Sequence, residues 1–253
     1  MERIVLKVGS AVLTNKNELA LNRLKDLVEL IYKLKQKDYQ VILVSSGAVS
    51  AGYTLLPLDK SIVSNKQSLA SIGQPLLMDT YRKKFNKYNI LCAQVLIEAS
   101  VFQDENRLTH SCNAINNLLE NNVVPIVNEN DVTAIDELVF GDNDQLAAHI
   151  THFFDANLLV ILTDIDGFYD ENPHINKDAK LLKYVNTIDD NMLDQEHTPN
   201  SEFATGGIVT KLKAAQFLLN HNHKMFLTSG FDLSDAYSYL LENIHVKGTL
   251  FEK

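Results

Sequence analysis

Short apolar runs alternate with helical patterns along the whole chain. Most of the runs lack polar alternation, which is typical of strands buried on both faces of a parallel sheet. Between two of them, Leu24, Leu27, Val28, Ile31 and Leu34 fall on one face of a helix. This rhythm predicts an α/β fold, a three-layer αβα sandwich with a mainly parallel central sheet. The expected strands are 3–8, 41–44, 91–97, 123–127, 158–162 and 225–227, with a closing edge strand at 248–251.

Length, charge and cysteine usage limit the class of protein. A chain of 253 residues can bury the core of one α/β domain or of two lobes. The net charge of −9 argues against a nucleic-acid partner, although local lysines can still bind an anion. Cys92, expected in the core, and Cys112 fit no disulfide or zinc pattern. No signal peptide or membrane-spanning run is found, so we expect a cytoplasmic protein without a membrane partner.

A glycine-rich segment at 205–211 precedes a predicted helix. Its two glycines let the backbone approach a ligand closely, and a helix start directs free N–H groups at it. A hydroxyl and a lysine follow within one turn, which favours phosphate. The segment is not a P-loop, because the G-x-x-x-x-G-K-S/T spacing is absent from the chain. The alternative is a tight turn followed by a solvated lysine. The residues are Thr205, Gly206, Gly207, Ile208, Val209, Thr210 and Lys211.

A second lysine-bearing loop lies at the N-terminus. A short apolar strand delivers Lys7 and is followed by a turn at Gly9 and Ser10. Taken alone, an exposed lysine near a first strand is an equally good interpretation. Together with the segment at 205–211, however, it suggests a phosphoryl-transfer enzyme with an unusual phosphate cradle.

Polar sequence follows several predicted strands at the point where ligands bind in α/β sheets. Such residues are also good turn and cap formers, which is the alternative explanation. The segments are 45–48, which includes Ser46, 128–131, which includes Asp131, and Thr163-Asp164.

Further segments carry local predictions. Asp142 is a candidate N-cap for a helix that begins near Gln145, and Asp144 can orient a lysine ammonium. Residues 131–140 are expected to be extended, and residues 189–205 to form a mobile surface loop. His221 and His223 lack a third candidate ligand nearby, so no protein metal site is expected.

These segments together resemble the glutamate 5-kinases of the amino acid kinase superfamily. The S-S-G-A-V-S-A-G sequence and the pair N-E-N-D and G-D-N-D are specific to that family, whereas the lysine loops also fit related kinases. Gly9-Ser10 stands where N-acetylglutamate kinases and aspartokinases usually have Gly-Gly, and Ala204 replaces an expected glycine. The matching segments are 5–10, 45–52, 124–131, 141–144, 162–164, 167–169 and 205–211.

The resemblance implies ATP-dependent phosphorylation of the γ-carboxylate of L-glutamate, the first step toward proline. It implies that Lys7 and Lys211 neutralise the transferring phosphoryl group and that Asp144 holds both lysines. Ser46, Asp131 and Asn143 match the glutamate-binding positions, with Asp131 expected at the ammonium and Asn143 at the α-carboxylate. Mg²⁺ would be held mainly by the ATP phosphates. The ATP-binding residues would be Lys7, Gly9, Ser10, Thr163, Asp164, Thr205, Gly206, Gly207, Ile208, Val209, Thr210 and Lys211.

The resemblance also implies one amino acid kinase domain over residues 1–253, without a C-terminal RNA-binding-type (PUA) module. Residues 1–155 would form the amino-acid-substrate lobe and residues 156–253 the nucleotide lobe. A homo-oligomer (dimer or tetramer) and feedback inhibition by proline are expected. Two rivals remain: a superfamily kinase for another acidic amino acid or a small phosphate, and a non-catalytic binding protein on the same scaffold.

Overall fold

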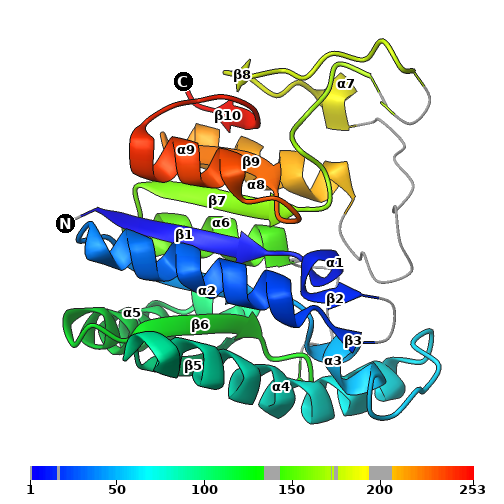
Figure 1. The fold of residues 1–253 in the computed structure, drawn as a ribbon, viewed down its shortest axis with the longest axis vertical. Coiled ribbons are helices and arrows are strands. Elements are labelled where there is room, and N and C mark those ends of the chain that lie inside the picture. The colour runs from blue at the N-terminus through cyan, green and yellow to red at the C-terminus, as the bar shows by residue number, and fades with distance from the viewer. Residues whose placement is uncertain (1, 16–17, 134–142, 172, 174–175, 194–206) are drawn as a thin grey trace.

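An eight-stranded sheet forms the centre of the molecule (Figure 1). The computed structural model describes residues 2–15, 18–133, 143–171, 173, 176–193 and 207–253. The strand order is β5-β6-β4-β1-β7-β9-β10-β8, and all pairs are parallel except β9 with β10. The strands are β1 (Arg3–Val8), β4 (Gln40–Ser45), β5 (Cys92–Ile97), β6 (Val124–Glu129), β7 (Leu158–Thr163), β8 (Tyr184–Val185), β9 (Lys224–Ser229) and β10 (Thr249–Phe251), with a separate hairpin of β2 (Thr14–Asn15) and β3 (Glu18–Leu19).

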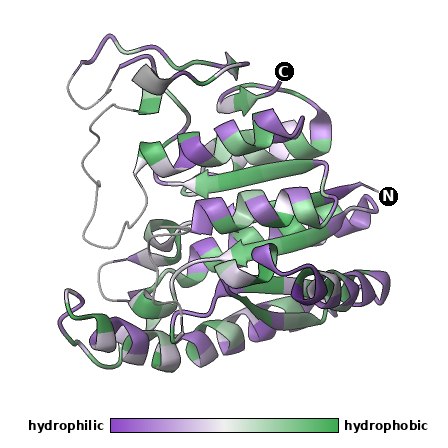
Figure 2. Ribbon diagram, turned by 180° about the vertical axis from the view of Figure 1, so that it is seen from behind, coloured by the Kyte–Doolittle hydropathy of each residue, from purple (hydrophilic) through white to green (hydrophobic). Residues whose placement is uncertain are grey.

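Helices cover both faces of this sheet, which gives the predicted three layers (Figures 1 and 2). One apolar core lies against α2, α4 and α9, and the other lies against α5, α6 and α8. In Figure 2 the strands are largely hydrophobic while the helices carry polar outer faces. The helices are α1 (Ser10–Leu13), α2 (Leu21–Gln36), α3 (Ala48–Tyr53), α4 (Val63–Phe85), α5 (Glu105–Glu120), α6 (Asn143–Phe153), α7 (Asp190–Leu193), α8 (Ile208–Asn220) and α9 (Ser234–Glu242), with 3-10 turns η1 (Asn86–Tyr88) and η2 (Ala99–Gln103).

Strand β1 lies in the middle of the sheet, parallel to both of its neighbours. Its side chains alternate between the two cores, because successive residues of a strand point to opposite faces. Leu6 and Val8 therefore pack in the α2 core, and Val5 packs in the α6 core. This alternation places Lys7 on the α6 side, at a register position between Val44 and Ile161.

The two helices α3 and α4 approach each other closely through glycine. A Cβ atom at Gly52 would lie 1.9 Å from the carbonyl oxygen of Leu69, and one at Gly73 would lie 1.8 Å from that of Ala48. No side chain fits at either position, so both glycines are required by the packing. The contact fixes α4 beside the carboxyl end of β4.

The predicted strands are all present, with ends shifted by one or two residues. The prediction for residues 248–251 was wrong in one respect: β10 is second from the edge, because β8 pairs with its far side. Cys92 is only half-buried: it packs against the margin of the α2 core and not inside it, because β5 is an edge strand. The helix predicted near Gln145 begins at Asn143.

Two loop predictions are corrected or left open. Residues 190–193 of the expected surface loop form the short helix α7, and residues 194–206 lie outside the described part of the chain. Of the segment expected to be extended, residues 131–133 form a turn instead, closed by a hydrogen bond from the Thr133 amide to the Asn130 carbonyl, and residues 134–140 lie outside the description. Among the described helices, none is long and apolar enough to cross a membrane.

Candidate active site

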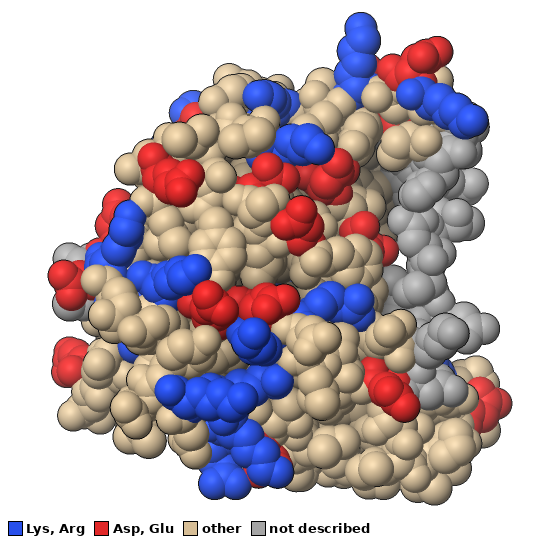
Figure 3. Space-filling view, viewed as in Figure 1, with Lys and Arg blue, Asp and Glu red and all other residues tan. Residues whose placement is uncertain are grey.

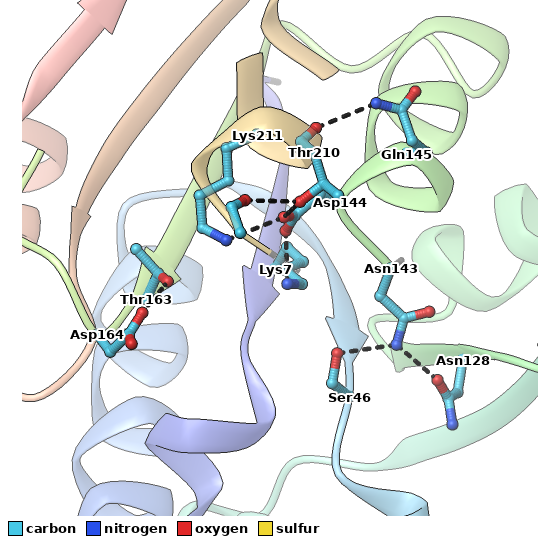
Figure 4. A network of polar contacts seen from close by, with 11 residues as sticks. Lys7, Ser46, Asn128, Asn143, Asp144, Gln145, Thr163, Asp164, Thr210 and Lys211 are labelled. Atoms are coloured by element: carbon cyan, nitrogen blue, oxygen red, sulfur yellow. Dashed lines mark hydrogen bonds and ion pairs between the residues drawn. The ribbon is translucent and has the colours of Figure 1, made fainter. Parts of the chain in front are cut away.

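Two lysines far apart in sequence bind one carboxylate at the carboxyl ends of the central strands (Figure 4). The ammonium of Lys7 lies 2.5 Å from Oδ1 of Asp144, and that of Lys211 lies 3.2 Å from Oδ2. The three residues are almost entirely removed from solvent, with exposed fractions of 2% for Lys7, 0% for Asp144 and 3% for Lys211. Two buried cations therefore share one carboxylate.

Local structure explains how the three side chains meet. Asp144 lies in the first turn of α6, which packs across β1. Lys211 lies in the first turn of α8, which begins after an N-cap at Gly207. The Thr210 hydroxyl is 3.0 Å from Oδ2 of Asp144, and the Gln145 side chain donates to the Thr210 carbonyl at 3.1 Å. These two contacts join the starts of α6 and α8.

The two buried ammonium groups indicate the kind of ligand that the site accepts. A buried charge is costly unless it is paired. Both ammonium groups lie beside a single carboxylate, so an anionic group of a ligand placed next to them gains electrostatic stabilisation. Figure 3 shows acidic and basic side chains interspersed on one face of the molecule, whereas the two lysines are buried. Their charge therefore acts on a bound ligand and not on the general surface.

A polar cluster lies on one side of the lysines, after β4 and at the end of β6. The side-chain nitrogen of Asn143 donates to the Ser46 hydroxyl and to Oδ1 of Asn128, both at 2.9 Å (Figure 4). The nitrogen of Asn128 lies 3.2 Å from Oε1 of Gln74 and 3.5 Å from Oδ2 of Asp131. We call the group of Ser46, Gln74, Asn128, Asp131 and Asn143 the polar cluster.

A second polar group lies on the other side of the lysines, at the end of β7. The hydroxyl of Thr163 donates to the carboxylate of Asp164 at 2.9 Å. Gly9 caps the short helix α1, which begins at Ser10, and the Gly9 amide donates to the Leu162 carbonyl at 3.0 Å. Because that amide is engaged within the sheet, Gly9 can contribute close backbone approach to a ligand but not its own N–H group.

Most of the site residues predicted from sequence lie together at the carboxyl ends of the central strands. Lys7, Asp144 and Lys211 are in contact, Ser46 and Asn143 are in contact, and Thr163 touches Asp164. Ile208 and Val209 form the first turn of α8 with Thr210 and Lys211. Thr205, Gly206 and Asp142 lie outside the described residues.

Sequence reasoning assigned no role to Asn128, Gln74 or Gln145. Asn128 lies within a segment singled out at a strand end, so its position was a signal in itself. The sequence signal at Gln74 is weaker: Gln74 is a polar residue on the apolar face of α4, one turn before Leu77. Gln145 follows two residues already selected, and nothing in its spacing marks it as a bridge to Thr210.

Comparison with known proteins identifies the family. The model of the amino acid kinase family matches residues 2–229. The glutamate 5-kinase of Wolinella succinogenes is 52% identical over 255 residues, which cover 99% of this chain and 98% of that protein. The glutamate 5-kinase of Leishmania donovani is 52% identical over 251 residues, covering 99% and 95%.

Among solved structures, an isopentenyl phosphate kinase has the same fold, with a TM-score of 0.70 at 16% identity and coverage of 99% of this chain and 100% of that one. At this identity the likeness shows the fold alone. The family model and the two full-length relatives carry the assignment further: the chain belongs to the amino acid kinase family and, within it, to the glutamate 5-kinases.

Proposed function

We propose that this chain transfers the γ-phosphoryl group of ATP to the γ-carboxylate of L-glutamate. The product is L-glutamyl 5-phosphate, and the reaction is the first step of proline biosynthesis. The observation that carries the proposal is the buried group of Lys7, Asp144 and Lys211 between two polar groups. Glutamate is inferred as the substrate because the two full-length relatives are glutamate 5-kinases.

The chemistry needs positive charge rather than a base. The γ-carboxylate of glutamate has a reference pKa of about 4.3, so the nucleophile is already ionised at neutral pH. The difficulty is to bring an anion up to a triphosphate. Fixed ammonium groups lower that repulsion and stabilise the charge on the transferring phosphoryl oxygens. Lys7 and Lys211 fill this role, and Asp144 keeps both ammonium groups aimed at one point.

The glutamate site is assigned to the side of Ser46, Asn143 and Asp131. The Asp131 carboxylate suits the substrate ammonium, and Ser46 and Asn143 offer neutral hydrogen-bonding groups for the rest of the amino-acid backbone. This side belongs to residues 1–155, which form the substrate lobe in our proposal. The position of the cluster next to Lys7 supports the assignment, because the γ-carboxylate must reach the phosphoryl group there.

The nucleotide site is assigned to the side of β7 and α8. Gly9, Ser10, Thr163, Asp164 and residues 205–211 are proposed to hold ATP, and residues 156–253 to form the nucleotide lobe. Mg²⁺ fits this site when carried by the nucleotide phosphates, its usual mode in kinases. Within the described residues, no group of three or more histidine, cysteine or acidic side chains is arranged to hold a metal ion by itself.

Regulation and assembly complete the proposal. Proline carries the same α-carboxylate and ammonium as glutamate, so it can occupy part of the site at Asp131 and Asn143. We propose that proline inhibits the enzyme in this way and that the protein works as a homo-oligomer.

The direct test is an acceptor panel with hydroxylamine trapping. Purified protein is incubated with ATP, Mg²⁺ and glutamate, aspartate, N-acetylglutamate or isopentenyl phosphate. ADP release is followed in a coupled assay, and acyl phosphates are trapped as hydroxamates. We expect a hydroxamate from glutamate, with Lys211→Ala as the matched inactive preparation. Turnover of another acceptor without turnover of glutamate contradicts the proposed function.

A further inference from the structure

We propose that Gln74 is a positioning residue that fixes which hydrogen-bonding atoms the polar cluster presents to glutamate. The inference rests on the proposed function and deepens it. Gln74 belongs to α4, whereas Ser46 follows β4 and Asn143 opens α6. It acts through Asn128, which lies between Gln74 and Asn143.

A chain of four side chains runs from α4 into the site. The nitrogen of Asn128 donates to Oε1 of Gln74 at 3.2 Å, and the oxygen of Asn128 accepts from the nitrogen of Asn143 at 2.9 Å. The same nitrogen of Asn143 donates to the Ser46 hydroxyl oxygen at 2.9 Å. Gln74 and Asn128 are buried, with exposed fractions of 8% and 3%, so neither amide can exchange its partner freely for water.

The direction of every bond in this chain follows from its two ends. The Asp131 carboxylate can only accept, so it faces the Asn128 nitrogen at 3.5 Å. That leaves the Asn128 oxygen toward Asn143, which must then present its own nitrogen. Gln74 secures the same arrangement from the other side, because its oxygen accepts from the Asn128 nitrogen.

This direction decides what remains for the substrate. Both protons of the Asn143 amide are used, one by Ser46 and one by Asn128, so its oxygen is the atom left to offer (Figure 4). Ser46 accepts a bond from Asn143 and keeps its own proton to donate. The Asn143 oxygen therefore suits the substrate ammonium, beside Asp131, and the Ser46 hydroxyl suits the α-carboxylate. This assigns Asn143 to the ammonium and not to the α-carboxylate, the neighbouring group on the same carbon that the sequence-based prediction gave it.

The packing of α4 holds Gln74 in this place. Gly73, the preceding residue, permits the close approach to α3. Two turns further along α4, the Tyr81 hydroxyl lies 2.9 Å from the Ser45 hydroxyl, next to Ser46. Burial raises the pKa of Tyr81, so its hydroxyl stays protonated and available for this bond. Helix α4 therefore contacts the site at two points, β4 through Tyr81 and β6 through Gln74.

The test replaces the Gln74 amide with a side chain of similar size that cannot accept a hydrogen bond. Gln74→Met is compared with Gln36→Met, the same change at an exposed position of α2. We expect Gln74→Met to raise KM for glutamate about tenfold, with KM for ATP within about twofold of wild type. We also expect its preference for glutamate over glutarate, which lacks the ammonium, to fall. Equal rises in both KM values, or unchanged kinetics, overturn the inference.

A double-mutant cycle separates positioning from general damage. If Gln74 acts through Asn143, Gln74→Met has little further effect on KM for glutamate when Asn143→Ala is already present. Additive effects overturn the inference. Should Gln74→Met not fold, Gln74→Leu removes the same acceptor with another uncharged side chain, and KM for glutamate must then rise while KM for ATP stays within about twofold of wild type. A wild-type protein that forms no hydroxamate from glutamate refutes the proposed function instead, so the two failures are distinct.

Discussion

Lys7 and Lys211 bind opposite oxygens of a single buried carboxylate, Lys7 at Oδ1 and Lys211 at Oδ2 of Asp144. One lysine comes from the first strand and the other from the last long helix before β9. The carboxylate therefore sets the distance between two ammonium groups that no local segment could hold together.

Removing one ammonium should affect turnover far more than glutamate binding. Lys211→Ala is expected to lower kcat by on the order of a hundredfold, because the lysine meets charge on the transferring phosphoryl group. Lys7→Ala should behave similarly. Lys213→Ala, an exposed lysine two residues along the same helix, is the matched control. Steady-state kinetics give kcat and KM for each variant. Near-normal turnover of Lys211→Ala would show that Lys211 has no part in the mechanism.

Asp144→Asn should affect stability as well as turnover. Without the carboxylate, the two buried ammonium groups lose the anion that they share, and removing one partner of a buried ion pair costs roughly 3–5 kcal/mol. We expect a clearly lower melting temperature that rises again with ATP and Mg²⁺, because the phosphates replace the missing negative charge. Differential scanning fluorimetry with and without nucleotide measures both effects. A variant as stable as wild type would mean that the carboxylate does not compensate the lysines.

Asp131→Asn tests which side of the site holds the amino acid. It removes the charge proposed to face the substrate ammonium, so KM for glutamate should rise and KM for ATP should remain nearly unchanged. Initial rates over a grid of both substrates give the two constants. If the ATP constant changes instead, the two lobes have been assigned the wrong way round.

Proline should compete with glutamate. Both ligands offer an α-carboxylate and an ammonium, so increasing glutamate should relieve the inhibition at fixed ATP. A titration of proline at several glutamate concentrations provides the measurement, and a parallel titration at several ATP concentrations is its control. Inhibition independent of glutamate would rule out an overlapping site.

A histidine group away from the active site should make stability fall in mild acid. Burial lowers the pKa of His149 and of His152, and for His152 the neighbouring His221 and His223 lower it further. A lowered folded-state pKa means that the unfolded chain binds more protons once the pH drops below about 6.5, so unfolding becomes easier.

The measurement for this prediction compares melting temperatures at pH 7.5 and pH 5.5. His152→Gln should reduce the difference between the two, since it removes one of the groups with a lowered pKa. His110→Gln, an exposed histidine on α5, is the control. An identical pH dependence in wild type and His152→Gln contradicts the prediction.

The sequence predicted the sheet well because its strands are apolar on both faces, a pattern that few other structures produce. It failed at the sheet edge, where β8 contains only two residues and has no pattern of its own. The lysine site was reachable through motifs at strand ends. The contact between Gln74 and Asn128 could not be predicted in this way, because it depends on the close approach of α3 to α4 at Gly52 and Gly73. Spacing along the chain does not reveal which helices touch.

The central place of β1 has a consequence for how the protein is made and monitored. The first strand to leave the ribosome is also the one that needs partners on both sides, β4 and β7, so it cannot be completed until residue 163 has been synthesised. Lys7 lies in that strand, and its partner Asp144 is followed by Lys211 only later in translation. The catalytic group can therefore assemble only late in translation, and a chain from which β1 has been removed lacks Lys7 and should be inactive.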